Sequence, residues 1–219
     1  MSLKKINLES LDNIPSIANL IQKSKALATL DAILMPDWNY RYYSFDSNWD
    51  IGEMMASMRT GSGDHYFILF ENDSAIIKEF NQDATLIDKF DNQTIINELS
   101  HELPKKFENF LKEPAFKIDE LTFLSWCQIS GKEWKTGRLS QFSKNDLTTS
   151  AERITAVTGD YSDYINWAEE YYEVKVDKIF AESVFDGVPL TNEMVITLNP
   201  ELTLDDIRED LDEIGYPTA

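Results

Sequence analysis

Oxygen-bearing side chains recur next to a predicted strand at residues 46–50 (DSNWD). Carboxylate or amide oxygens stand there at alternate positions, as they do at the start of a calcium loop. An EF-hand loop that began at Asp46 would need Gly at its sixth position and Glu at its twelfth, where this chain has Ile51 and Ser57. The EF-hand is therefore excluded, and a looser divalent-cation site is the alternative.

A glycine-rich loop follows at residues 60–65 (TGSGDH). A phosphate-binding loop opens onto a helix N-terminus, and the segments on both sides of this loop have the pattern of strands. A nucleophile elbow needs serine within G-x-S-x-G on a strand-to-helix turn, and the spacing here is Gly61-Ser62-Gly63. We interpret the loop as a hairpin connection whose glycines supply positive φ.

A carboxylate-dependent hydrolase, acting with or without a metal ion, is the enzymatic alternative. Its candidate residues lie at strand ends beside loops: Asp46, Asp50, Glu53, Asp64 and His65. Nitrogen and sulfur ligands are scarce, because His65, His101 and Cys127 fall in three separate elements. Cys127 lies in a predicted strand, where a buried, inert thiol is expected. We therefore expect no bound metal and no cofactor.

Two groups of residues have the character of an interface. The first is a dense aromatic cluster around Arg41, in which Tyr40, Tyr42 and Trp49 could anchor a partner. Packing in the core is the alternative for these rings. The second group surrounds Arg208 near the end of the chain and consists of Asp205, Asp206, Glu209, Asp210 and Glu213. Acids late in a helix oppose its dipole, so they indicate binding, with a solvated face as the alternative.

The charge of the chain is concentrated in its last sixty residues. Residues 160–219 hold sixteen acidic and three basic side chains, a net charge of −13 out of −19 for the whole chain. Such a charge disfavours nucleic acid as a partner and favours a basic protein. No apolar run resembles a signal peptide or a membrane span, and a single cysteine excludes an internal disulfide. We expect a cytoplasmic protein without membrane contact.

The first two thirds of the chain combine helical and strand patterns. Apolar spacing predicts a helix over residues 14–35, ended by Pro36, and another over 92–112. Short aromatic and aliphatic runs at 40–45, 53–59, 65–71 and 75–80 predict a four-stranded antiparallel meander over 39–80. The third run is apolar on both faces and is expected at the centre of the sheet. Further strands are expected over 121–136, with Trp134 in the second of them.

The C-terminal third has the pattern of helices throughout. Tyr171 and Tyr172 are expected on the buried face of a helix that begins near residue 161, and a short helix is expected over 177–185. Thr191 and Thr203 are expected to cap two more helices, and Gly215 to end the last one in the left-handed conformation. The fold class is therefore α+β: a mostly antiparallel sheet, an N-terminal helix and an acidic helical C-terminal third. We expect one unit over 1–219, with an internal boundary near 140–150 (1–140 and 147–219) as the alternative.

Two stretches of the chain resemble a group of bacterial proteins that carry a domain of unknown function. The similar segments are 42–45 (YYSF), 55–59 (MASMR), 61–64 (GSGD), 190–191 (LT), 198–200 (LNP) and 213–217 (EIGYP). The resemblance extends along most of the chain and implies a bacterial, cytosolic origin. It implies no activity and no site residues.

Our leading hypothesis is a non-enzymatic binding protein that presents an acidic surface to a basic protein partner. A concrete version is an immunity-type protein that occludes a cationic toxin domain, with electrostatic steering to accelerate association. The hydrolase is the alternative hypothesis, and a regulatory module that acts through oligomerisation is a third. The sequence leaves the oligomeric state open.

Overall fold

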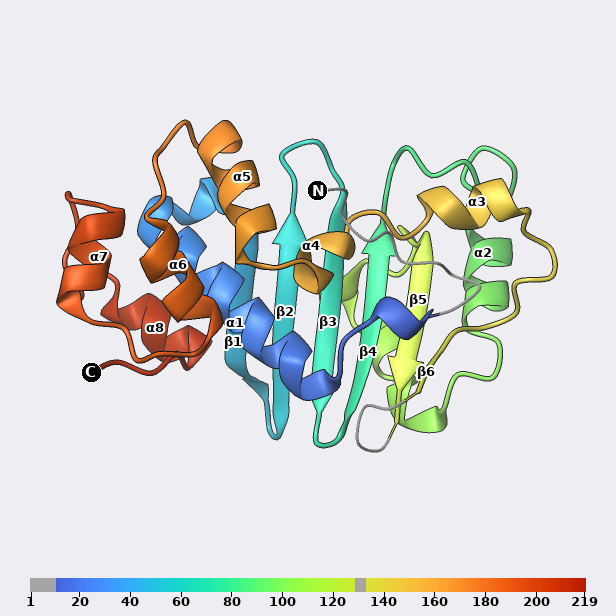
Figure 1. The fold of residues 1–219 in the computed structure, drawn as a ribbon. Helices are drawn as coiled ribbons and strands as arrows, with labels where there is room; N and C mark the ends of the chain where they lie inside the picture. Colours follow the sequence, from blue (N-terminus) through green and yellow to red (C-terminus); the bar gives the residue numbers. More distant parts are fainter. Residues whose placement is uncertain (1–10, 129–132) are drawn as a thin grey trace.

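The computed structural model describes residues 11–128 and 133–219 and has a six-stranded antiparallel sheet flanked by helices (Figure 1). The strands are β1 (Tyr43–Asp50), β2 (Glu53–Arg59), β3 (His65–Glu71), β4 (Ser74–Phe80), β5 (Phe123–Cys127) and β6 (Trp134–Lys135). The α-helices are α1 (Ile17–Leu34), α2 (Asn92–Leu99), α3 (Lys144–Thr149), α4 (Thr155–Thr158), α5 (Tyr161–Tyr171), α6 (Lys178–Phe185), α7 (Asn192–Leu198) and α8 (Arg208–Ile214). Short 3-10 turns are η1 (Leu11–Asn13), η2 (Trp38–Tyr40), η3 (Lys105–Phe107), η4 (Phe110–Lys112) and η5 (Pro114–Phe116). The α+β prediction is confirmed.

The strands lie in the sheet in chain order, because tight hairpins join the first four. β3 pairs on both sides and is buried on both faces, as its continuous apolar run predicts. The sequence pattern ends this strand at residue 45 and predicts a turn in the polar residues 46–48; that prediction is wrong, because β1 continues through a bulge to Asp50. The chain reverses at Ile51 and Gly52 instead, where Gly52 has the positive φ of +76° that the turn requires.

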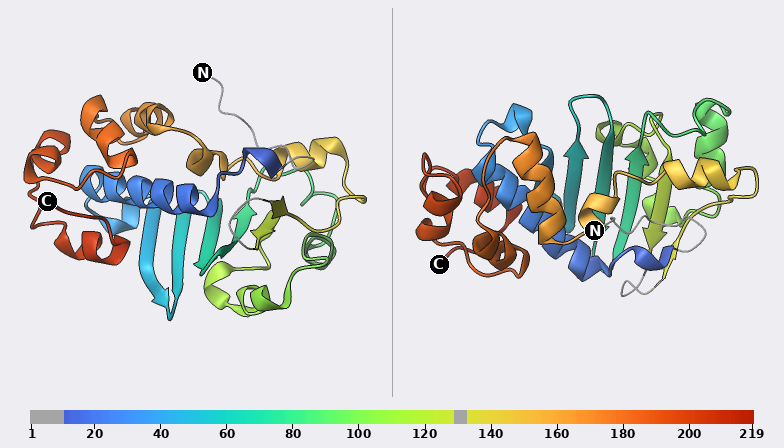
Figure 2. Two further views of the ribbon diagram at one scale, coloured as in Figure 1. Left: turned by 60° about the horizontal axis from the view of Figure 1, so that its bottom comes forward. Right: turned by 45° about the horizontal axis from the view of Figure 1, so that its top comes forward.

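The two faces of the sheet are covered by different segments (Figure 2). α1 lies across one face and packs on β1 and β2, with α4 and α5 on the same side. The short turns η3 to η5 lie against the other face, where the Phe116 ring packs against Phe67 and Trp49 in tilted contacts, at 5.5 and 5.7 Å between ring centroids. The expected helix over 92–112 is therefore wrong after Leu99. Pro104 disfavours helical backbone before it, and Glu102 has a positive φ of +65°.

The C-terminal helices α6, α7 and α8 pack on α1 at the end of the sheet beyond β1 (Figure 1). Thr191 caps α7 by accepting a hydrogen bond from the Met194 amide, and Gly215 ends α8 with φ +64°, so both predictions are confirmed. The Thr203 cap is wrong: its hydroxyl donates to Asp206, and α8 begins only at Arg208.

Residues 140–150 form part of the framework around the sheet. Asn81, just after β4, donates its side-chain amide to the Thr149 carbonyl at 2.8 Å. The Thr122 hydroxyl, just before β5, donates to the Ser150 carbonyl at 3.0 Å. An internal boundary in this segment stays a prediction. The two strands expected over 121–136 need a turn between them, predicted at Gly131-Lys132, and this turn lies outside the described residues.

None of the helices found in 11–128 and 133–219 combines the length and hydropathy needed to cross a bilayer.

Candidate functional site

Two hollows of the surface meet at Tyr42 and Thr60, at the end of the β1–β2 pair. The first, of about 150 Å³, is lined by Trp38, Asn39, Tyr40, Arg41, Tyr42, Ser44, Arg59, Thr60, Gly61 and Tyr171. The second, of about 250 Å³, is lined by Leu27, Tyr42, Tyr43, Met58, Thr60, Glu152, Arg153, Thr155, Asp163, Tyr164 and Trp167. The strand register puts Ser44 and Ser57 on the opposite face of the sheet from Tyr43 and Met58. The hollows therefore lie on opposite faces and are joined around the strand ends.

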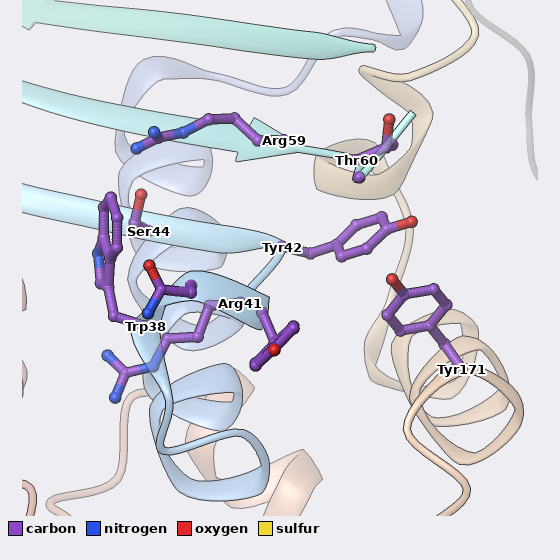
Figure 3. Close-up of a pocket in the computed structure, with 10 residues that line it drawn as sticks. Trp38, Arg41, Tyr42, Ser44, Arg59, Thr60 and Tyr171 are labelled. Carbon is purple, nitrogen blue, oxygen red and sulfur yellow. The ribbon is translucent and has the colours of Figure 1, made fainter. Parts of the chain in front are cut away.

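Exposed aromatic rings form the walls of the first hollow (Figure 3). After α1 ends, Asp37 accepts a hydrogen bond from the Asn39 amide and starts the η2 turn, which directs Trp38 and Tyr40 outward. Trp38 is 55% exposed, Tyr40 66% and Tyr171, from the last position of α5, 49%. An aromatic group of this size with so little cover is typical of a recognition surface.

Tyr42 separates the two hollows and is held from both sides. Its ring lies 4.6 Å from that of Tyr171 and 4.8 Å from that of Trp167. Figure 3 shows the Tyr42 and Tyr171 hydroxyls facing each other. Partial burial, together with the neighbouring Tyr171 hydroxyl, raises the pKa of Tyr42 to about 12. The Tyr42 phenol is thus a neutral hydrogen-bonding group at physiological pH.

A buried carboxylate, Asp31 of α1, fixes this aromatic wall. It accepts hydrogen bonds from the Tyr42 and Tyr43 amides at 2.9 and 2.8 Å, and from the Tyr164 and Tyr172 hydroxyls at 2.8 and 2.9 Å. Burial raises the pKa of Asp31 to about 6, against the opposing effect of these hydrogen bonds. One side chain thereby joins α1, the start of β1 and α5. Its signal in the sequence is an acid inside the apolar run of the helix, which the helical pattern alone does not explain.

Arg41 connects the first hollow to α8. Its guanidinium makes a bidentate ion pair with Asp210, at 2.5 and 3.0 Å, and donates to the carbonyls of Met35 and Pro36. The residues it joins lie 169 positions apart in the chain. Arg41 is thus neutralised, and the acidic residues of α8 stand beside the aromatic hollow.

Arg59 has a different environment. Its guanidinium lies 5.1 Å from the centre of the Trp38 ring, a cation–π contact, and the residue is exposed. The other four arginines all form ion pairs: Arg41–Asp210, Arg138–Glu98, Arg153–Asp64 and Arg208–Asp205. Within the described residues, Arg59 pairs with no carboxylate.

The second hollow has an apolar floor and a charged rim. Leu27, Tyr43 and Met58 form the floor, and Arg153 stands at the rim with its Nη2 2.7 Å from the Asp64 carboxylate. The Nε of Arg153 is buried and has no hydrogen-bond partner in the part of the chain that the structure describes. The hollow could thus enclose an apolar side chain with a polar tip.

The residues of the hydrolase hypothesis lie at two places. Asp46, Asp50 and Glu53 are at the β1–β2 turn, where burial and the charges of Glu71 and Asp50 raise the pKa of Glu53. Asp64 and His65 are at the opposite end of the same strands, since His65 pairs with Arg59 and Glu53 with Glu71. No group of three or more His, Cys, Asp or Glu side chains among the described residues is arranged to hold a metal ion.

Asp64 and His65 are already bonded within the protein. Asp64 accepts from Arg153 and from the Gln82 amide at 2.9 Å. His65 shares hydrogen bonds with the Gly63 carbonyl at 2.9 Å and with Lys78 Nζ at 2.6 Å, and burial beside Lys78 lowers its pKa to about 4. Cys127 is a buried free thiol in β5. The hydrolase stays a prediction, with its residues divided between two ends of the sheet.

The residues of the binding hypothesis are brought together in part. Tyr40, Arg41 and Tyr42 all line the first hollow, whereas Trp49 packs on Phe116 away from it. The exposed members of the acidic group on and before α8 are Asp205, Asp206, Glu209 and Glu213, and Asp210 is the partner of Arg41.

The residues of the first hollow that sequence reasoning missed include Asn39, Ser44, Arg59 and Tyr171. The helical period assigned Tyr171 to the buried face, but α5 ends at this residue and its ring projects over the hollow. Arg59 carried a signal as a charged residue beside a glycine-rich loop. Ser44 carried none.

No protein-family model, curated protein or solved structure matches this chain.

Proposed function

We propose that this protein is a non-enzymatic binding protein of the bacterial cytosol that takes a basic protein as its partner. In its immunity-type form, it would occlude the functional surface of a cationic toxin domain. The observation that carries the proposal is the junction at Arg41–Asp210, where an exposed aromatic hollow adjoins an acidic helix.

The aromatic part supports a protein partner. Trp38, Tyr40 and Tyr171 are large, rigid side chains, so ordering them on binding costs little conformational entropy. Trp, Tyr and Arg are also the side chains that dominate interface energetics when they are desolvated at the centre of a contact.

The acidic part supports a basic partner. Asp205, Asp206, Glu209, Asp212 and Glu213 are all exposed on or just before α8, where Arg208 is the one basic side chain. Partial burial and the nearby carboxylates of Asp46 and Asp210 raise the pKa of Glu213. Repulsion among these carboxylates would be relieved by a cationic surface, which would also be steered towards them during association.

The test compares two triple variants of equal charge change. The first, which we call the α8 triple, is Glu209→Gln, Asp212→Asn and Glu213→Gln. It spares Asp205, Asp206 and Asp210, which have partners within the protein. The control triple, Asp73→Asn, Asp88→Asn and Glu108→Gln, neutralises three exposed carboxylates on other elements.

The wild-type protein, immobilised, is used to isolate a partner from a bacterial lysate at low salt, and the affinity of the purified partner is then measured for each variant. We expect a basic partner whose affinity for the wild-type protein falls as salt is added. The α8 triple should bind this partner at least tenfold more weakly than the wild type, and the control triple should bind it as tightly as the wild type. Binding that is equally sensitive to both triples, or insensitive to salt, would contradict the proposal.

The aromatic hollow is tested separately with Trp38→Ala and Tyr40→Ala. A matched control is Ile179→Ala, which removes a 72% exposed apolar side chain from α6. We expect each aromatic substitution to weaken binding by about tenfold or more and the control to leave it unchanged. Equal effects of all three would exclude the hollow from the interface.

A further inference from the structure

The first hollow is lined by positively charged side chains, although the surface beside it is acidic. The chain has 39 acidic and 20 basic side chains, yet no carboxylate lines this hollow and two arginines do. The Arg41 guanidinium is compensated by Asp210, so Arg59 is the uncompensated cation there. The other four arginines all have carboxylate partners in this structure, so acidic side chains are available for pairing. Arg59 is the exception, since it faces solvent without such a partner among the described residues.

The guanidinium of Arg59 is also oriented. It rests against the Trp38 indole, which limits its rotation and leaves the edge of the planar fork open to a ligand. Figure 3 shows Arg59, Trp38 and Ser44 on the same side of the hollow. The Ser44 hydroxyl is 2.7 Å from that of Ser57, which is buried, so Ser44 retains hydrogen-bonding capacity towards the hollow.

We propose that this hollow binds a carboxylate on a short apolar stem, supplied by an Asp or Glu side chain of the basic partner. Arg59 would bind the carboxylate through two parallel hydrogen bonds, with Ser44 as a further donor. The stem would lie against the aromatic side chains that line the hollow. A volume of about 150 Å³ is about five times that of a water molecule in the liquid, enough for a carboxylate and two methylene groups.

A carboxylate fits this site better than a phosphate. The site offers one uncompensated guanidinium, whose planar fork matches the two oxygens of a carboxylate. The adjoining carboxylates of Asp210 and Glu213 would repel a phosphate dianion more strongly than a monoanion.

The consequence is selectivity among basic proteins. An acidic face alone would attract any cationic surface, whereas Arg59 would repel a partner that presents a lysine or arginine at this point. A partner with a carboxylate at that position, surrounded by basic residues, would dock in one register. That the carboxylate belongs to a basic protein rests on the proposed function.

The first experiment tests the site without the partner. The indole N–H signal of Trp38, assigned with Trp38→Phe, is followed by NMR during titration with N-acetylglutamate amide, its glutamine counterpart or inorganic phosphate. We expect saturable shifts with the glutamate probe and at least tenfold weaker binding of the other two. Arg59→Gln should abolish the shifts, Arg59→Lys should weaken them, and Arg208→Gln should leave them unchanged. Equal binding of glutamate and glutamine probes, or tighter binding of phosphate, would overturn the inference.

The second experiment uses the purified partner and Arg59→Glu. If the hollow received a cationic side chain, or if only the overall charge mattered, this substitution would strengthen binding, because it makes the protein more acidic. We expect it to weaken binding at least tenfold. If the α8 triple binds the partner more weakly and Arg59→Glu binds it more tightly, the carboxylate site is overturned and the proposed function stands. An α8 triple with unchanged affinity would remove the proposed function itself, whatever the free glutamate probe does.

Discussion

Lys78 lies at the centre of the sheet with its side chain fully buried. Its Nζ is 2.6 Å from His65 Nε2, and His65 Nδ1 is 2.9 Å from the Gly63 carbonyl. Because the carbonyl can only accept, Nδ1 carries the proton and Nε2 accepts a hydrogen bond from Lys78. Burial lowers the pKa of Lys78 to about 7, with Glu120 as the principal opposing charge. The pair joins β3 and β4 beneath the segment that ends at Glu120.

Replacing Lys78 by Met should change the pH dependence of stability. Between about pH 7 and pH 10.5, the unfolded chain binds a proton on Lys78 that the folded protein lacks. The contribution of Lys78 to the free energy of unfolding therefore rises with pH across this window, by up to about 1.4 kcal/mol per pH unit. Urea titrations from pH 7 to pH 10 should show this rise in the wild type relative to Lys78→Met.

Lys112→Met removes an exposed lysine and serves as the control. Its free energy of unfolding should stay parallel to that of the wild type over the same pH range. Parallel curves for Lys78→Met as well would mean that Lys78 remains protonated in the folded protein.

The elements depend on close backbone approaches that a single methyl group would disturb. The segment after β6 passes the end of α2, where the Arg138 amide donates to the Glu98 carbonyl at 2.7 Å. A Cβ at Gly137 would lie 2.2 Å from the Glu98 carbonyl oxygen and 2.4 Å from that of Leu99. Since both atoms belong to the backbone, neither can move without displacing α2.

Gly137→Ala is therefore expected to lower the free energy of unfolding by about 3 kcal/mol through overpacking. Gly61→Ala is the matched control, because a Cβ there meets no atom within 4 Å. Chemical denaturation measures both variants. A Gly137→Ala protein as stable as Gly61→Ala would show that the segment and α2 separate easily.

The charge of the whole molecule is as uneven in space as in sequence. The helices α6 to α8 of the acidic C-terminal third lie together at one end of the sheet (Figure 1), and α8 packs on β1 near Asp46. The acids late in α8 also oppose the helix dipole. This end of the molecule is thus expected to repel itself at low ionic strength.

Raising NaCl from low concentration to about 0.5 M shortens the Debye length to a few ångströms and should stabilise the protein. If screening contributes about 1 kcal/mol, Tm should rise by about 2–4 °C. The α8 triple should have a higher Tm at low salt and a smaller response to salt than the control triple. Thermal melts that gave both triples the same response would assign the repulsion to another part of the surface.

Local pattern was sufficient where an element is determined by its own residues. The apolar period of α1, the continuous apolar run of β3 and the glycine at the end of α8 all predicted the observed structure. Prediction failed where one residue overrides a period. The helical period breaks after α2, where Glu102 has a positive φ and Pro104 follows, and the chain reverses at Gly52 instead of directly after residue 45.

The sequence by itself determined the α+β class, the charge asymmetry and the presence of aromatic and acidic candidates. Only the tertiary structure decided which of them meet. Arg41 and Asp210 meet because β1 and α8 both pack on α1. Tyr42 and Tyr171 meet because Asp31 of α1 accepts hydrogen bonds from the start of β1 and from the tyrosines of and just after α5. A period of 3.6 or 2 residues assigns a side chain to a face, but it carries no information about which distant segment covers that face. Arg59 was left without a carboxylate for the same reason, because pairing depends on how the packed elements bring distant side chains together.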